Sequence, residues 1–173
     1  MFVPRLTAPS ETDPKWIMQS AGGKNPCIRG WNAIGYSVLN NCTGYTIGRA
    51  MELYGLDDAM KLPWQYNAKE YFPNLKESEI WKKSNKPSLG AIICFYRAGS
   101  AQGGHVGVVE QINSDGSITT SNSAWEGSRF YVETLKPPTY SWSANYVLQG
   151  FIYNTKGPKA SSSKIEDFIA KAK

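Results

Sequence analysis

Apolar residues recur at helical spacing in one long stretch of the first half of the chain, residues 42–54. The residues on neighbouring rows of this predicted helix are Cys42, Tyr45, Arg49 and Leu53. Asn40 and Asn41 are suited to cap its start, and Gly55 is suited to end it. Two shorter helical pieces are predicted at residues 57–61 and 67–72, with Pro63 and Pro73 breaking them. Residues 1–41 lack periodicity and predict surface loops with a short strand or two, of which residues 1–25 form an irregular extension.

From residue 88 onward the pattern changes to short runs typical of β-strands. The runs cover residues 90–97, 104–112, 117–124, 129–135 and 147–153. A turn over residues 113–116, with a glycine at its exit, predicts a hairpin between the second and third runs. Helices followed by an antiparallel meander of about five strands indicate an α+β fold and exclude a doubly wound parallel sheet.

The last part of the chain differs in composition from the rest. Residues 155–164 read as a flexible linker, and residues 163–166 resemble a capping box. The apolar stripe that follows consists of Ile165, Phe168, Ile169 and Ala172. This stripe fits either a terminal helix docked on the domain or the first helix of a further domain. We favour the second, and so predict a domain over residues 1–155 and a linker with the start of a downstream domain over 156–173.

Composition and charge exclude several classes of protein. A chain of 173 residues with 41% hydrophobic and 13% aromatic residues is too apolar to be disordered, and its apolar runs are too short to span a membrane. The net charge is +5, of which residues 156–173 carry +3, so the folded part carries only +2. We therefore expect no nucleic-acid partner, and only a weak attraction to anionic surfaces such as a bacterial wall. Residues 1–20 lack the apolar core of a signal peptide.

The scarcest residues are the candidates for chemistry. The chain contains three cysteines, Cys27, Cys42 and Cys94, whose spacing matches no zinc motif. An odd number of cysteines without a secretory signal favours free thiols. Cys94 lies in an apolar strand and is predicted to be buried and inert, while nothing marks Cys27. Cys42 stands in the first turn of the predicted helix, where free N–H groups lower a thiol pKa and can hold an oxyanion. The alternative reading of Cys42 is a small buried residue.

His105 is the single histidine, at the start of a predicted strand after two glycines. It is a candidate general base, although a structural histidine is the alternative. Because side chains alternate along a strand, Glu110 is predicted to face away from His105, as a surface or structural carboxylate. Asn122, on the next strand, is placed to accept an imidazole N–H and set its tautomer, unless it is an ordinary polar residue near a turn.

These residues lie in motifs that resemble the CHAP domain, the cysteine- and histidine-dependent amidohydrolase/peptidase family. The motifs are Asn41-Cys42-Thr43-Gly44-Tyr45 with Arg49, then residues 87–93, then Gly104-His105-Val106-Gly107-Val108-Val109-Glu110, and finally residues 116–119 and 150–153. The resemblance covers about residues 25–155 in the family's order. It implies a papain-like fold, in which a helix that carries the cysteine packs on an antiparallel sheet that carries the histidine. It also implies the N-terminal catalytic module of a bacteriophage endolysin, held in the host cytoplasm until it is released to the wall.

Two positions depart from the family's pattern. Many CHAP domains place Glu and Asn two residues apart on the strand after the histidine strand, and here these positions are Asn122 and Ala124. The usual Gly-Asp pair of the preceding strand reads Gly90-Ala91. Some phage members bind calcium through an Asp-rich loop, but Asp57-Asp58 lacks the spacing of such a loop. We therefore predict no metal and no cofactor.

The function that these observations favour is hydrolysis of an amide bond in the peptide of bacterial peptidoglycan. Cys42 is the predicted nucleophile, His105 the base and Asn122 the residue that orients it, with Asn41 as an oxyanion donor. Tyr45 and Trp125 are predicted to contact substrate, and Trp31, Tyr36 and Trp142 are further groove candidates, with the core as the alternative for each. The bond is either the muramoyl-alanine amide or a peptide bond, and the rival hypothesis is a silent wall-binding module. We expect this fragment to be a monomer.

Overall fold

The computed structural model describes residues 1–9, 41–101, 103–125, 127–141 and 143–158. Three helices precede the sheet in the described part of the chain: α3 (Cys42–Tyr54), α4 (Leu56–Ala59) and α5 (Ala68–Asn74). Helix α3 has the predicted bounds, because the Asn41 side chain caps its start and Gly55, at φ 89°, ends it. Helix α5 runs to Asn74, with Pro73 inside its last turn. The sequence had instead predicted that Pro73 breaks this helix.

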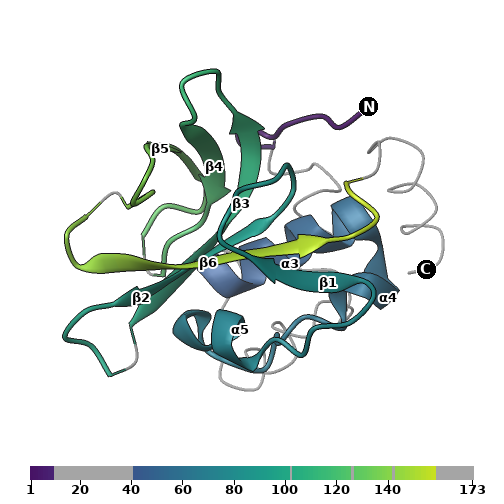
Figure 1. Cartoon of the computed structure of the whole chain (residues 1–173), viewed down its shortest axis with the longest axis horizontal. Helices are drawn as coiled ribbons and strands as arrows, with labels where there is room; N and C mark the ends of the chain where they lie inside the picture. The colour runs from purple at the N-terminus through teal and green to yellow at the C-terminus, as the bar shows by residue number, and fades with distance from the viewer. Residues whose placement is uncertain (10–40, 102, 126, 142, 159–173) are drawn as a thin grey trace.

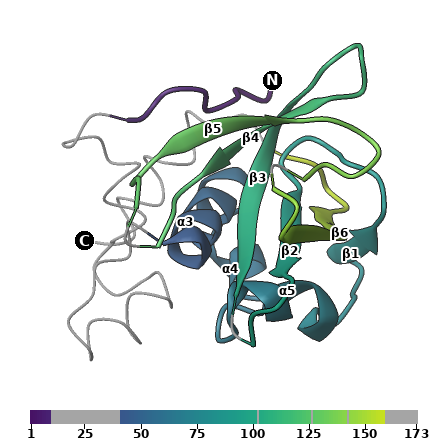
Figure 2. The same cartoon turned by 90° about the vertical axis from the view of Figure 1, so that its left-hand side faces the viewer.

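The sheet is antiparallel, with the strand order β1-β6-β2-β3-β4-β5. Its strands are β1 (Trp81–Ser84), β2 (Ile92–Arg97), β3 (Gly104–Ile112), β4 (Ile118–Asn122), β5 (Tyr131–Leu135) and β6 (Tyr146–Asn154). The sheet curls, and Figures 1 and 2 show α3 running beside β3 while α5 lies across one end of the sheet. The α+β class is confirmed, and the described residues form six strands where about five were expected.

Alternation along the strands divides the apolar side chains into two clusters on opposite faces of the sheet. The cluster on the helix side joins α3 to Val106 and Val108 of β3, and the other cluster contains Phe95 and Val109. Trp81 of β1 is fully buried in the first cluster, and its indole N–H donates to the Asp58 carbonyl at 2.7 Å. The contacts of α3 with Val106 and Val108 thus pack this helix against β3, the strand that carries His105.

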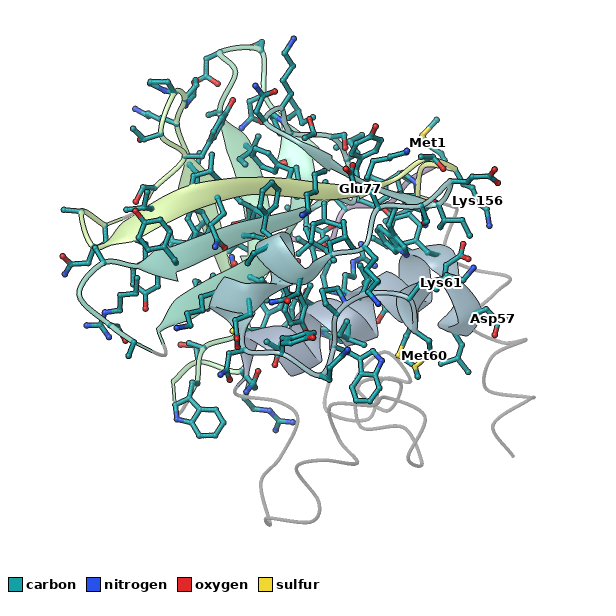
Figure 3. The ribbon with its side chains drawn as sticks, turned by 60° about the horizontal axis from the view of Figure 1, so that its bottom comes forward. Met1, Asp57, Met60, Lys61, Glu77 and Lys156 are labelled. Carbon is teal, nitrogen blue, oxygen red and sulfur yellow. The ribbon has the colours of Figure 1, made fainter. Side chains whose placement is uncertain are left out.

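Both described ends of the chain pack on this domain. Arg5 is buried, and its backbone N–H donates to Glu110 at 2.9 Å. At the other end, Lys156 pairs with Asp58 at 2.9 Å, and Asp58 also meets Lys61 at 3.5 Å. Figure 3 shows Lys61 and Lys156 on the same side of the molecule. The remainder of the predicted linker and the apolar stripe at 165–172 lie outside the described residues.

Candidate active site

Cys42 is the first residue of α3, and the local structure holds that helix end against β4. The Asn41 side-chain oxygen accepts the backbone N–H groups of Thr43 at 2.7 Å and Gly44 at 3.3 Å. The Asn41 backbone N–H donates to the Ser123 hydroxyl at 3.1 Å, one residue beyond the end of β4. The predicted cap is confirmed. The cap uses the side-chain oxygen of Asn41, and an oxyanion would need its side-chain NH₂ group. The oxyanion role of Asn41 therefore stays a prediction.

Cys42 is half-buried as a residue, and its sulfur accepts a hydrogen bond from the Val106 backbone of the histidine strand. Burial raises the pKa of the Cys42 thiol, whereas backbone hydrogen bonds from Val106, Thr43 and Cys42 itself lower it, and the net change is upward. The lowered pKa expected at a helix N-terminus is therefore wrong in direction, because desolvation outweighs the N–H groups. The contact with Val106 places the sulfur at the backbone of β3, one residue along the chain from His105.

His105 is held by Asn122. The His105 side chain is buried, and its Nε2 lies 3.0 Å from the Asn122 Oδ1. The Asn122 Nδ2 donates to the Thr120 hydroxyl at 2.9 Å and to the Thr120 carbonyl at 3.2 Å, which turns Oδ1 toward the imidazole. Because Oδ1 can only accept, Nε2 carries the proton and Nδ1 is left as the basic nitrogen. The structure thus brings together the predicted pair His105 and Asn122.

The electrostatics of the site favour neutral groups at rest. Burial lowers the pKa of His105 to about 4, although the hydrogen bond with Asn122 acts to raise it. With a raised thiol pKa on Cys42, the resting groups at neutral pH are a thiol and a neutral imidazole. Such a pair works by general-base catalysis, in which the proton leaves sulfur as the sulfur attacks.

Gly107 makes the contact between His105 and Asn122 possible. A Cβ on Gly107 would lie 2.2 Å from the Asn122 Oδ1 and 3.2 Å from its Cγ. The Asn122 side chain therefore lies across the space where residue 107 has no side chain. In this way it reaches His105, two residues earlier on the same face of β3. Gly107 was quoted in the family motif, but sequence reasoning assigned it no role.

Tyr131 is a site residue that sequence reasoning missed. It is paired with Asn122 across β4 and β5, and its hydroxyl oxygen lies 3.4 Å from the His105 Nε2. The two rings lie with centroids 6.3 Å apart at an interplanar angle of 32°. The sequence contains no signal for this contact beyond a tyrosine in a strand, because the pairing register of β4 with β5 decides it.

Glu110 and Tyr45 take part in a buried polar network on the face opposite His105. Glu110 accepts two hydrogen bonds from the Arg49 guanidinium, at 3.0 and 2.9 Å, and one from the Ser121 hydroxyl at 2.7 Å. The prediction that Glu110 faces away from His105 is confirmed. It is a structural carboxylate, and the surface alternative is wrong because its side chain is buried. Arg49 and Arg5 both pair with Glu52 in the same network.

The predicted substrate contact of Tyr45 is wrong. Its side chain is 0% exposed, and its hydroxyl donates to Ser121 at 2.8 Å, so the ring belongs to the core. Trp125 is 48% exposed, three residues after Asn122, and its contact with substrate stays a prediction. Cys94 is buried, as predicted. Cys27, Trp31, Tyr36 and Trp142 lie outside the described residues.

Within the described residues, no three His, Cys, Asp or Glu side chains gather in a group that could hold a metal ion. Nor does any helix in the same part of the chain have the length and apolar character needed to cross a bilayer.

Comparison with known structures shows where this fold occurs. Ly7917 matches over 82% of this chain and 60% of its own, with 15% identity and a TM-score of 0.50. Ly7917 with the hydrolyzing product of MDP gives 15% identity and a TM-score of 0.46, over 83% of this chain and 63% of that one. N-acetylmuramoyl-L-alanine amidase from Staphylococcus aureus gives 21% identity and a TM-score of 0.44, over 67% of this chain and 30% of its own. This chain thus spans less than two thirds of each of these structures.

Comparison by sequence identifies the family. No curated protein sequence matches the chain. The profile of the CHAP domain matches residues 31–124, which is more than half of the chain and includes Cys42, His105 and Asn122. The predicted papain-like arrangement, with a helix that carries Cys42 packed on an antiparallel sheet that carries His105, is the one that the structure shows. The chain therefore belongs to the CHAP domain family.

Proposed function

We propose that this protein is a peptidoglycan hydrolase that cleaves an amide bond by Cys-His catalysis. The observation that carries the proposal is the geometry of three groups. Nε2 of His105 is held by Asn122 at 3.0 Å, while the Cys42 sulfur accepts a backbone hydrogen bond from Val106, the next residue after His105. Membership of the CHAP domain family supports an amide bond of peptidoglycan as the substrate.

The reaction follows from the protonation states of these groups. Nδ1 of His105 takes the Cys42 thiol proton as the sulfur attacks the amide carbonyl carbon, and Asn122 accepts from the Nε2–H of the imidazolium that forms. The imidazolium then gives its proton to the leaving amine as the C–N bond breaks, which leaves a thioester. Water, deprotonated by His105, hydrolyses the thioester and restores the thiol. The Cys42 backbone N–H and the Asn41 amide are the proposed oxyanion donors, since the Asn41 side-chain oxygen already accepts the N–H groups of Thr43 and Gly44.

The substrate bond and the biological setting belong to the same proposal. The muramoyl-alanine amide and the peptide bonds of the stem and cross-bridge are all amides, and the catalytic groups treat them alike. The sequence motifs support an endolysin role, with a downstream domain that directs a monomeric catalytic module to the wall. Trp125, exposed near the end of β4, is the proposed substrate contact.

The test compares two cysteine variants on purified walls. Cys42→Ala is expected to abolish the fall in turbidity and the release of new amino groups. Cys94→Ala, a matched change at a buried thiol, should keep the activity of the folded fraction. Mass spectrometry of the released fragments identifies the bond. Lysis by Cys42→Ala would refute the nucleophile, and wall binding without released amino groups in the unmodified protein would favour the silent binding module.

A further inference from the structure

Tyr131 contacts the imidazole on the same nitrogen that Asn122 binds. Its Oη lies 3.4 Å from Nε2, compared with 3.0 Å for the Asn122 Oδ1. Because the bonds from Asn122 to Thr120 place the proton on Nε2, the Tyr131 oxygen faces an N–H group. Burial and the nearby Cys42 raise the pKa of Tyr131, so its hydroxyl stays neutral at the pH of catalysis. The Nε2–H therefore has two neutral oxygen acceptors.

The surroundings of His105 explain why a second acceptor matters. The described residues around it include Phe95, its pairing partner on β2, Asn122 of β4 and Tyr131 of β5. Cys42 of α3 and Glu133 of β5 act electrostatically on Tyr131. The carboxylate nearest along its own strand, Glu110, is engaged on the opposite face by Arg49, Ser121 and the Arg5 backbone. The contacts of the His105 Nε2 with the Asn122 amide and the Tyr131 hydroxyl are both with neutral groups. A neutral amide stabilises the imidazolium formed in catalysis less than a charged partner would.

We propose that Tyr131 is a positioning residue for His105, whose hydroxyl oxygen shares with Asn122 the stabilisation of the imidazolium formed when Cys42 gives up its proton. This proposal rests on the proposed function for its catalytic meaning, but the contact itself can be measured without activity. The ring of Tyr131 lies tilted beside the imidazole, and its backbone pairs with Asn122. The residue is thus placed to fix the direction of Nε2–H.

The experiment uses Tyr131→Phe, which keeps the ring and removes only the oxygen. Because His105 is the single histidine of the chain, NMR of ¹⁵N-labelled imidazole reports on this site alone. We expect the His105 titration to move to lower pH, since one acceptor of the charged form is lost. On purified walls, kcat should fall about 3- to 10-fold with KM unchanged, as expected for one weak hydrogen bond. The acidic limb of the kcat profile should move to lower pH with it.

The controls separate this role from a structural one. Tyr96→Phe removes a hydroxyl from an exposed tyrosine of β2, next to the partner of His105, and should change neither kcat nor the titration. If Tyr131→Phe leaves the His105 titration in place, the proposal is overturned, whether or not kcat falls. Lysis by Cys42→Ala would instead refute the proposed function, while the titration of Tyr131→Phe would still decide whether the contact exists.

Discussion

Replacing Gly107 with alanine should strongly lower activity by displacing the Asn122 side chain, although Gly107 itself is not a predicted catalytic residue. The new Cβ would lie 2.2 Å from the Asn122 Oδ1, so this oxygen must withdraw to at least 3.0 Å. Asn122 is 1% exposed and bound twice to Thr120, so its amide cannot withdraw and also keep the 3.0 Å contact with His105. Misplacing a catalytic group by such a distance lowers kcat/KM by about 10²-fold.

The same change should cost stability, because the site is already filled. Overpacking of a buried position costs about 1–3 kcal/mol of unfolding free energy. The assay is the release of amino groups from purified walls, corrected for the folded fraction, together with urea unfolding. Gly99→Ala is the control for adding a methyl group away from the site. Unlike Gly107, Gly99 has a positive φ, 76°, at which alanine is strained, but a Cβ there meets nothing within 4 Å, so we expect some loss of stability and full activity per folded molecule.

A double variant identifies the route of the effect. If Gly107→Ala acts by displacing Asn122, then adding it to Asn122→Ala should change kcat/KM by less than about twofold, because the displaced group is already gone. A further drop of the full size in the double variant, or wild-type kcat/KM in Gly107→Ala alone, would show that Asn122 does not position His105 as inferred.

Three further predictions follow from the packing and charges of the site. Glu110→Gln should lower the free energy of unfolding by about 3–5 kcal/mol, because it leaves the two buried cations Arg5 and Arg49 with Glu52 as the remaining carboxylate of their network; a loss below about 1 kcal/mol in urea unfolding would contradict this. Thr120→Val removes the 2.9 Å acceptor that orients Asn122, so kcat should fall about 3- to 10-fold while KM in the wall assay stays unchanged. The lowered pKa of His105, about 4 against an ordinary 6.5, means that the unfolded chain binds a proton there before the folded one does. Stability should therefore fall as the pH drops from about 6.5 to about 4, by up to about 3 kcal/mol, and His105→Gln should flatten that slope in urea unfolding.

The elements with strong local signals could be read from the chain. Helix α3 was predicted with its bounds, because the Asn41 cap and Gly55 act within one turn of the backbone they end. The short β1 was not predicted, because its four residues, Trp81–Ser84, include two lysines and form a strand only by pairing with β6. Strand β6 lies more than 60 positions further along the chain, and no local pattern encodes that pairing.

For the site, the alternation of side chains along β3 and the hairpin to β4 were enough to predict that His105 and Asn122 lie together. These two strands are joined by a short turn, so their neighbours are nearly a local property. Gly107 and Tyr131 needed more, because each acts through the exact cross-strand position of another side chain. Sequence patterns place residues on faces, whereas contacts of this kind depend on register.

The residue types alone determined which chemistry is available to this protein: one imidazole, a thiol at a helix start, and an amide one hairpin away. Only the tertiary structure decided the protonation states of these groups and the buried places of Tyr45 and Glu110. The physical reason is that desolvation is a sum over every neighbour in space. That sum reverses the effect expected from the helix end at Cys42 and makes the resting pair neutral.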